Sequence, residues 1–517
     1  MNKKRGGKVV AVIDIGSNAV KMRVAQMQNN VVKDLDLLYS PLRLGHEVFS
    51  QGKISFDSLR ELSATLRGYS QVMTEYGVSQ YKIVATTVFR EAQNRAYVTD
   101  QLKIQNDMTI EVLEDDQEKT LIYSEILRNL SEPDAPKIGN ALVAYIGTGS
   151  IGVALYSEQR MIFSQNISIG SLKLHDLLRG IQDETPEFYT VLDEYLNGII
   201  GRIALPPTKK PVDSLIITGN EMELIAKTLQ APLKKKRYLI DASQMEQLFT
   251  TIRDMPPEKI SLLYDMSESE AELLYTSLAI YLHILRLTDA KRIISPKIDL
   301  WDAVARQLLI SKSKAEYDEH VRTSALSCAV TLAQHYQCNH AHLETVRSFA
   351  CLVFDKLKKI HGLSNKRRLL LELAALLHEC GYYVNSKYHL RSTFDLIKNT
   401  DIYGLTDEEV YLIAHVARYT EFFVPSYDDR EYAALSEKSK LLVSKLVAIF
   451  RLANALDKSS KQKLQDVKVR LQEDTLVITA VSDQNVSLEK WAFDECAPFF
   501  EEVFGIKPQL VVKPLMF

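Results

Sequence analysis

The sequence has few cysteines and no long apolar runs. Its five cysteines form an odd set among 517 residues and include no close C-x-x-C pair. They favour reduced, structural thiols over a disulfide framework or a zinc site. No apolar run approaches the roughly 18 residues that a membrane-spanning helix needs. Residues 1–8 lead directly into an apolar run without a signal-peptide segment. These absences predict a cytoplasmic protein that does not enter a membrane.

An excess of charge of one sign is also absent. The chain has 63 Lys and Arg against 66 Asp and Glu, for a formal net charge of −3. This balance gives no overall attraction for nucleic acid, so binding of any polyanion must come from local groups. Hydrophobic residues make up 46% and charged residues 25%, as in an ordinary globular protein. The length predicts roughly three or four domains.

One pattern occurs twice: a β-branched apolar run, a turn rich in glycine and serine, and a returning apolar run. The first copy covers residues 9–24 and the second covers residues 141–155. Each copy predicts two strands joined by a tight turn. Turns of this kind leave backbone N–H groups free at the tip, where they bind phosphate oxygens. The duplication predicts one anionic ligand held between two related domains.

The second turn, residues 147–152, also matches the G-x-G-x-x-G string of dinucleotide-binding folds. That fingerprint must open a helix. Here residues 153–156 continue as an apolar strand and lead into a turn at Ser157 and Glu158. The context therefore disfavours nicotinamide or flavin binding.

The order of predicted elements divides the chain into four parts. Residues 1–135 mix strands and helices, and the same order repeats in residues 136–312. Residues 313–460 carry long helical periodicities. Residues 461–517 return to strands with one helix, which predicts a small α+β domain at the C-terminus.

Further motifs resemble one family. DIGSN at 14–18 resembles the first phosphate loop of the exopolyphosphatase and guanosine pentaphosphate phosphatase family, in the actin-like ATPase superfamily. ATTVFREAQN at 85–94 is similar to that family's A-T-[ST]-x-x-R-x-A-x-N segment, and SIGSLKL at 168–174 resembles its L-G-x-V-R-L turn. The resemblance implies an α/β fold of two actin-like (ribonuclease H-like) lobes with a cleft between them. An all-α HD-like domain and the small α+β domain would follow.

The resemblance implies hydrolysis of a terminal phosphoanhydride in inorganic polyphosphate or guanosine pentaphosphate. This reaction needs a carboxylate that orients water, a divalent cation and donors that hold the phosphate oxygens. Glu118 matches the catalytic glutamate of the family's E-E-A-R helix, which reads QEKT at 117–120 here, and Asp14 matches a ligand of Mg²⁺ or Mn²⁺. By residue type alone, Glu118 equally suits a helix N-terminus and Asp14 a turn. The implied phosphate-binding residues are Gly16, Ser17, Asn18, Lys21, Arg90, Asn94, Gly147, Thr148, Gly149, Ser150, Lys173 and Gly219.

The second loop departs from the family pattern D-x-G-G-G-S-T-E. Tyr145 stands in place of the Asp and Gly152 in place of the Glu. Two carboxylates expected to hold magnesium are therefore absent, which predicts a weakened metal site. Two hypotheses follow: an enzyme that is slow or altered in its metal use, or a catalytically degenerate protein that binds polyphosphate or guanosine tetraphosphate. A sugar kinase-like or acetate kinase-like ATPase is a weaker third, because no adenosine pocket is identified.

The helical part carries histidines in an order that resembles the metal-dependent HD phosphohydrolases. These are His342, His378 (followed by Glu379), His389 and His415, and Asn454 comes after them. The HD site needs Asp where this chain has Glu379 and Asn454, so we expect a scaffold rather than a second active site. The family resemblance further implies a homodimer. No aromatic and basic RNA-binding module is recognisable, so no specific nucleic-acid partner is expected.

Overall fold

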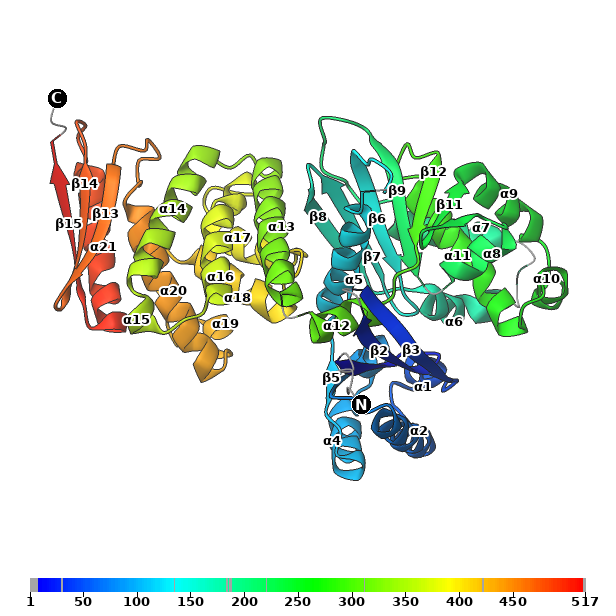
Figure 1. The fold of residues 1–517 in the computed structure, drawn as a ribbon. Helices are drawn as coiled ribbons and strands as arrows, with labels where there is room; N and C mark the ends of the chain where they lie inside the picture. The colour runs from blue at the N-terminus through cyan, green and yellow to red at the C-terminus, as the bar shows by residue number, and fades with distance from the viewer. Residues whose placement is uncertain are drawn as a thin grey trace. The chain divides into compact units, whose positions relative to one another are not determined.

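The computed structural model describes residues 8–28, 31–133, 135–182, 185, 188–219, 221–310, 312–420 and 423–514. The chain forms two compact units, residues 1–321 and residues 322–517. The first unit contains two sheets with helices, and the second contains a helical bundle and a small sheet (Figure 1). This arrangement confirms the mixed α/β class that the sequence predicts.

The first sheet contains the first copy of the repeated hairpin. β1 pairs antiparallel with β2, and Ile15 lies opposite Val20, so residues 16–19 form the turn. β3 pairs antiparallel with β2, whereas β4 and β5 extend the other edge in parallel, in the order β3-β2-β1-β4-β5. The elements are β1 (Val9–Ile15), β2 (Val20–Gln28), β3 (Val31–Ser40), α1 (Leu44–Gln51), α2 (Phe56–Glu75), β4 (Gln80–Ala85), α3 (Thr87–Glu91), α4 (Arg95–Asn106), β5 (Ile110–Val112) and α5 (Asp115–Leu130).

The second sheet repeats this topology. Its order is β10-β11-β12-β9-β6-β7-β8, so β8-β7-β6-β9-β12 reproduces the first sheet with the same antiparallel and parallel pairings. The repeated sequence pattern therefore corresponds to a duplicated fold. The elements are β6 (Asn140–Ile146), β7 (Ile151–Ser157), β8 (Arg160–Ile167), α6 (Ser171–Gln182), α7 (Phe188–Ile199), β9 (Val212–Gly219), α8 (Met222–Thr228), β10 (Leu233–Lys234), β11 (Arg237–Asp241), α9 (Ala242–Ile252), α10 (Pro257–Tyr264), α11 (Glu268–Leu285) and β12 (Arg292–Pro296).

The helix that follows the second sheet packs on the first one. α12 (Leu300–Leu309) contacts β1, β2 and α5. It begins after Asp299, which forms a capping box with Asp302: each side chain accepts a hydrogen bond from the other residue's backbone N–H. Residues 300–309 thus belong by packing with the first sheet, although the sequence places them after the second. We call the first sheet with its helices and α12 lobe I, and the second sheet with its helices lobe II.

The second unit begins inside α13 (Ser313–His335). Its core is rich in leucine and alanine from α14, α16, α18 and α20, as the long apolar periodicities predict. A sheet of order β13-β14-β15 closes the chain, with α21 packed on β15 and α20. The elements are α14 (His340–Lys356), α15 (Lys358–His361), α16 (Asn365–Leu377), the 3₁₀ helix η1 (Cys380–Tyr383), α17 (His389–Lys398), α18 (Asp407–Arg418), α19 (Arg430–Ala433), α20 (Glu437–Ala455), β13 (Gln465–Gln472), β14 (Thr475–Val481), α21 (Ser487–Phe504) and β15 (Lys507–Lys513).

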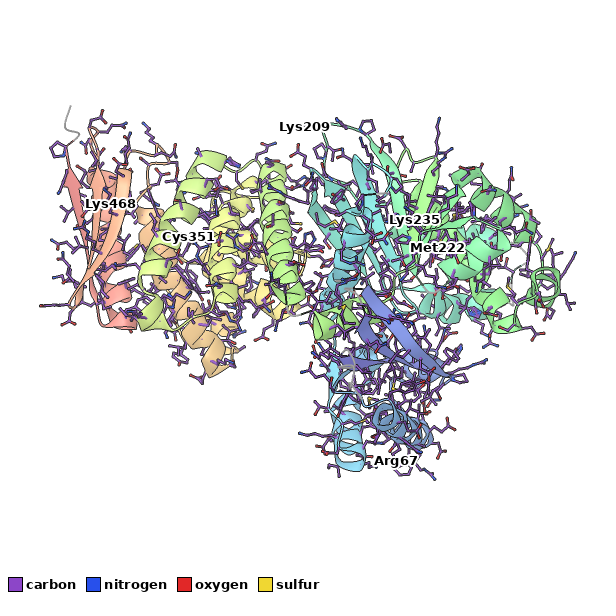
Figure 2. The ribbon with its side chains drawn as sticks, viewed as in Figure 1. Arg67, Lys209, Met222, Lys235, Cys351 and Lys468 are labelled. Atoms are coloured by element: carbon purple, nitrogen blue, oxygen red, sulfur yellow. The ribbon has the colours of Figure 1, made fainter. Side chains whose placement is uncertain are left out.

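All five cysteines are free thiols. Cys338 is half-buried and the others, Cys328, Cys351, Cys380 and Cys496, are buried. Cys351, labelled in Figure 2, lies within the helical bundle, and burial raises the pKa of its thiol to about 11. Across the described residues, every helix is too short or too polar to cross a lipid bilayer.

Candidate functional site

The two repeated turns meet at the boundary between the lobes. The turn of residues 16–19 is closed by a hydrogen bond from Gly16 N to Ala19 O of 3.0 Å, and the turn of residues 147–150 by one from Gly147 N to Ser150 O of 2.9 Å. The Thr148 hydroxyl donates to Ser17 Oγ at 3.1 Å and joins the two tips. The duplication thus places two equivalent turns face to face.

Close packing fixes the second turn. A Cβ added at Gly149 would lie 2.1 Å from Thr87 Cγ2 at the start of α3. A glycine is therefore required here by the approach of lobe I. Among the described residues, no acceptor is found for the backbone N–H groups at the tips of the turns, those of Ser17, Asn18, Thr148 and Gly149. These N–H groups are available to an anionic ligand.

A cavity of about 240 Å³ lies beside the turns. Its lining includes five acids and one lysine, so it carries negative charge. A bare polyanion would be repelled by such a lining, whereas an anion accompanied by divalent cations would be accepted. The charged residues are Asp14, Glu118, Glu221, Glu270, Asp299 and Lys21, and the turns contribute Gly16, Ser17, Asn18 and Thr148.

Asp14 ends β1 inside this cavity. Its Oδ1 is buried, and none of the described residues donates a hydrogen bond to it. Burial raises the pKa of Asp14 to about 7; Lys21 lowers it, and Asp299 and Glu118 raise it further. An unsatisfied buried carboxylate oxygen costs free energy unless a proton or a cation neutralises it.

We expect Asp14→Asn to stabilise the protein at pH 8 when divalent cations are removed by a chelator. The folded carboxyl group holds its proton up to a pKa of about 7, whereas the unfolded group loses it near 3.8. The wild type therefore loses stability as the pH rises between these values, and the gain from the substitution is about 2–4 kcal/mol above pH 7. Thermal unfolding of both proteins at pH 5 and pH 8 checks this. An equal difference at the two pH values would contradict it.

Glu118 lies in the first turn of α5, with its side chain buried at the lobe boundary. A capping box formed by Glu114 and Gln117 fixes the start of this helix. Glu118 Oε2 accepts from Arg90 Nη1 at 2.8 Å, and Oε1 accepts from the Tyr145 hydroxyl at 3.2 Å. Burial raises the pKa of Tyr145 well above its ordinary value, and the Glu118 charge raises it further, so the phenol stays a donor. Lobes I and II therefore both orient this carboxylate.

Arg90 also belongs to a buried network of ion pairs and hydrogen bonds. Arg90 Nη2 donates to Asp115 Oδ1 at 2.9 Å, and Ser150 Oγ donates to the same oxygen at 2.7 Å. Asp115 Oδ2 accepts from Lys119, which is 1% exposed and also donates to Ser150 Oγ at 3.1 Å. Burial raises the pKa of Asp115, but Lys119 and Arg90 outweigh that effect and hold it below its usual value. The network links Lys119 through Asp115 and Arg90 to Glu118.

Gly152 makes room for Lys119. A Cβ at Gly152 would lie 2.4 Å from Lys119 Cδ and 2.5 Å from the Tyr123 hydroxyl oxygen. The lysine stem therefore fills the volume that a side chain on β7 would need. Its ammonium group places a positive charge within the protein beside Ser150.

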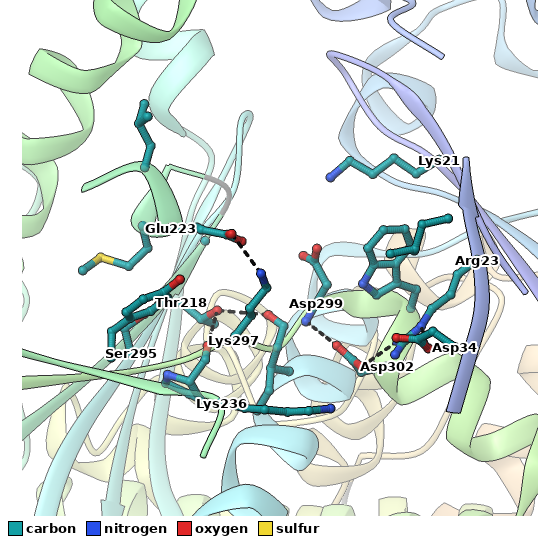
Figure 3. Close-up of a pocket in the computed structure, with 18 of the residues that line it drawn as sticks. Lys21, Arg23, Asp34, Thr218, Glu223, Lys236, Ser295, Lys297, Asp299 and Asp302 are labelled. Carbon is teal, nitrogen blue, oxygen red and sulfur yellow. Dashed lines mark hydrogen bonds and ion pairs between the residues drawn. The ribbon is translucent and has the colours of Figure 1, made fainter. Parts of the chain in front are cut away.

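A larger cavity of about 820 Å³ adjoins the first, and the two share Lys21, Tyr39, Leu224, Glu270 and Asp299. Figure 3 shows Lys21 and Arg23 on one wall, with Glu223 and Lys297 on the other. Lys21 Nζ lies 5.5 Å from the Trp301 ring centroid, a cation–π distance. Arg23 is neutralised by Asp34 and Asp302, and Lys297 by Glu223.

Three residues predicted to bind phosphate have other contacts. Asn94 donates from Nδ2 to Ile54 O at 2.8 Å and accepts from Ile54 N at 3.1 Å, so its amide holds a loop of lobe I. Lys173 pairs with Glu91 at 2.7 Å and lines a different cavity. The Arg90 guanidinium makes four hydrogen bonds within the protein, to Leu113 O, Glu118, Thr87 and Asp115. These contacts make Arg90 a residue that positions Glu118, and its contact with phosphate stays a prediction.

The other predicted residues lie at or near the cavities. Gly219 lies at the larger cavity, where a Cβ would meet Ile146 O at 2.3 Å, and the neighbouring Asn220 lies outside the described residues. Gly147 and Gly149 shape the second turn, and the Ser150 side chain is used by the Asp115–Lys119 pair. Those that line the smaller cavity are Asp14, Gly16, Ser17, Asn18, Lys21, Glu118 and Thr148.

Three of the five acids that line the smaller cavity were not predicted from the sequence: Glu221, Glu270 and Asp299. Glu221 accepts from Ser171 Oγ at 2.9 Å through Oε1, while Oε2 is buried and no described residue donates to it. Asp299 caps α12. Burial raises the pKa of the Glu221 and Asp299 carboxyl groups, and Lys21 lowers both. The position of Glu221, just after the end of β9, was the one sequence feature that pointed to a site. Asp299 could not be found in this way, because it enters the cavity only through the packing of α12 on lobe I.

The smaller cavity fits a magnesium ion accompanied by phosphate. Mg²⁺ is usually bound by one or two carboxylates together with substrate phosphates and water. Asp14 Oδ1 and Glu221 Oε2 are buried oxygens without a donor among the described residues. The described part of this cavity holds no cluster of three potential ligand atoms close together. Asp14 is thus the residue that would hold the ion, with phosphate completing its coordination.

Comparison with family models decides the relationship. The model for the Ppx/GppA phosphatase family matches residues 23–304, and that for Ppx/GppA phosphatase domain III matches residues 287–493. The chain belongs to the Ppx/GppA phosphatase family. The family membership that the sequence motifs indicate is thereby confirmed.

Solved Ppx/GppA structures are among the similar folds. The Aquifex aeolicus family member is 21% identical, covers 59% of this chain and 98% of its own, and has a TM-score of 0.49. An exopolyphosphatase from Cytophaga hutchinsonii is 18% identical, covers 59% and 98% of the two chains, and has a TM-score of 0.47. MreB5 of Spiroplasma citri, bound to ADP, is 12% identical, covers 60% and 98%, and has a TM-score of 0.26.

Proposed function

We propose that the chain hydrolyses terminal phosphate from inorganic polyphosphate or guanosine pentaphosphate, with Mg²⁺ or Mn²⁺ as cofactor. The observation that carries the proposal is the position of Glu118. This carboxylate lines a small cavity bounded by both phosphate-loop-like turns. Donors from lobe I and lobe II hold its two oxygens. Membership of the Ppx/GppA phosphatase family supports this reaction class.

In this proposal each group of the cavity has a separate role. Glu118 accepts a hydrogen bond from water and takes its proton as the water attacks phosphorus. The N–H groups of Ser17, Asn18, Thr148 and Gly149 bind the phosphate oxygens on which charge accumulates. Lys21 offers a point charge at the entrance to the larger cavity, where the rest of the substrate would extend. The cation held by Asp14 would neutralise phosphate oxygens.

A second function, binding without turnover, is favoured by a specific observation. Both oxygens of Glu118 already accept hydrogen bonds from Arg90 and Tyr145, and neither Tyr145 nor Gly152 supplies a second-loop acid. A site of this kind holds polyphosphate or guanosine tetraphosphate but hydrolyses it slowly or not at all. The predicted homodimer and cytoplasmic location stay predictions under either function.

Phosphate release from long-chain polyphosphate tests the proposal. We expect the full-length protein to release phosphate when Mg²⁺ or Mn²⁺ is present and to lose this activity in excess chelator, because the acidic cavity repels the bare polyanion. The same assay with guanosine pentaphosphate identifies the preferred substrate. The matched control is Lys209→Ala, because this exposed lysine pairs with Glu158 and lines neither cavity, so its removal should leave turnover unchanged. Binding of polyphosphate without release would overturn the enzyme reading in favour of the binding protein.

A further inference from the structure

Two histidines and a glutamate lie close together in the second unit, outside lobes I and II. His342 lies in the first turn of α14, and His378 and Glu379 directly follow α16. One ligand atom of each lies within 4.8 Å of the others. Both histidines are buried, and Glu379 is half-buried. In the described part of the chain, no other group of three or more His, Cys, Asp or Glu residues is as close.

In both His342 and His378, a hydrogen-bond acceptor lies next to Nδ1, whereas no described residue hydrogen-bonds to Nε2. His342 Nδ1 lies 2.9 Å from Asp457 Oδ2, and His378 Nδ1 lies 2.9 Å from the Ala375 carbonyl oxygen. A carbonyl or carboxylate oxygen only accepts, so Nδ1 carries the proton in each ring. In the neutral ring, Nε2 then holds a lone pair. Both lone pairs belong to the three-residue cluster.

Asp457 is itself held in place. Its Oδ1 accepts from Gln462 N at 2.7 Å, and its Oδ2 accepts from Gln462 Nε2 at 2.9 Å. Metal-binding histidines typically donate their other ring N–H to such a fixed carboxylate, which sets the tautomer and raises ligand basicity. Asp457 therefore provides the outer carboxylate of a metal-binding histidine. Asn454, which the sequence pattern pointed to, is not part of the cluster.

Among the described residues, Glu379 forms no ion pair with a lysine or an arginine. Glu379 Oε1 lies 3.9 Å from His342 Nε2, and Glu379 Oε2 accepts from Asn339 N at 3.3 Å. A carboxylate that faces an imidazole lone pair is electrostatically unfavourable until a cation lies between them.

We propose that His342, His378 and Glu379 bind one divalent transition-metal ion of the zinc and cobalt class. Two imidazoles and one carboxylate are the ligands of known catalytic zinc sites, which keep a further position for water. Imidazole favours zinc-like ions, whereas magnesium prefers oxygen ligands. Metal–ligand bonds of about 2.0–2.2 Å bring tetrahedral donors to roughly 3.3 Å from one another. The Glu379 and His342 ligand atoms, now 3.9 Å apart, would have to approach by about 0.6 Å to reach that separation. This proposal is independent of the proposed phosphatase function.

Titration of the full-length protein with Co²⁺, in excess Mg²⁺, tests the site. We expect one equivalent to bind with a visible absorption spectrum of low symmetry, and Zn²⁺ to displace it. Asp457→Asn should weaken binding by roughly 10- to 100-fold, because it removes only the outer carboxylate. Glu379→Gln, an isosteric change, and His378→Ala should each weaken it further. His340→Ala is the matched control, since that exposed histidine lies on the same helix outside the cluster.

The thiols beside the cluster provide a further check. Cys338 Sγ and Cys380 Sγ lie 3.7 Å apart, and Cys380 directly follows Glu379. We expect Cys338→Ser to leave the cobalt spectrum unchanged and no sulfur-to-metal charge-transfer band to be present. Such a band, or unchanged affinity in a folded Glu379→Gln variant, would overturn the assignment. Absence of tight Co²⁺ and Zn²⁺ binding by the wild type would overturn the site itself, and Asp14→Asn should retain binding in full.

Discussion

Replacing Glu118 by glutamine is expected to lower polyphosphate turnover by about 10²- to 10⁴-fold, the usual contribution of a general base. Glutamine keeps the volume of the side chain, and its amide oxygen still accepts from Arg90 or Tyr145, but it cannot take a proton from water. The Michaelis constant should change little, since the phosphate-binding N–H groups are untouched. Steady-state phosphate release with saturating Mg²⁺ provides the measurement.

Two control variants separate catalysis from structure. Glu125 lies on the same helix, is equally buried and pairs with Arg128 and Arg306, so Glu125→Gln disturbs an ion pair remote from the cavity. We expect it to lower stability and leave turnover per folded molecule unchanged. Tyr145→Phe removes one donor to Glu118 and should cost about fivefold in turnover, the equivalent of one hydrogen bond of about 1 kcal/mol. Wild-type turnover in Glu118→Gln would show that Glu118 is only a member of the ion network.

Introducing glutamate at position 152, where the family pattern has an acid, is expected to lower the stability of the folded protein when it is the only change. The substitution Gly152→Glu places a Cβ 2.4 Å from Lys119 Cδ and 2.5 Å from the Tyr123 hydroxyl oxygen. Overpacking of a well-packed core costs about 1–3 kcal/mol, and a larger side chain at a fixed strand position lies at the upper end. We expect loss of at least about 3 kcal/mol of stability, measured by chemical denaturation.

Removing Lys119 at the same time should recover much of that loss. In the double variant Lys119→Ala with Gly152→Glu, the introduced carboxylate takes the volume that the lysine stem leaves. Asp115 then lies near a second acid with no ammonium group between them, so Mg²⁺ should stabilise this variant more than it stabilises the wild type. Matched denaturation series with and without Mg²⁺ test the coupling. Additive losses from the two single substitutions would show that positions 119 and 152 are independent.

Much of the fold follows from local patterns in the sequence. The two hairpins have alternating apolar residues and tight glycine-rich turns, so their strands and their equivalence were predictable from residues 9–24 and 141–155 alone. The capping box at Glu114 and Gln117 similarly marks the start of α5. Helix α12 was not assignable to lobe I, because its position depends on packing against β1 and α5. Local pattern determines an element but does not determine the sheet on which it packs.

The position of the two turns at the candidate site was predictable from the sequence, but most partners of its charged side chains were not. Asp14 and Glu118 face the same cavity, as the family motifs imply. The sequence shows which helix carries Arg90 but does not show that Asp115 and Glu118 neutralise its charge. The Lys119 side chain packs against Gly152, although the two residues are 33 positions apart and lie on a helix and a strand of different lobes. The sequence shows only that the acid is absent, whereas the structure shows that the Lys119 stem fills the volume beside Gly152.

The position of α12 limits how the lobes can move. The chain passes from lobe I to lobe II after α5 and returns through residues 297–299 into α12, so two separate covalent crossings join them. Two bodies connected at two points rotate most easily about the line through those points. The second crossing ends at Asp299, whose side chain both caps α12 and lines the cavity. A cation or phosphate bound there would therefore contact the residue at which the second crossing enters lobe I.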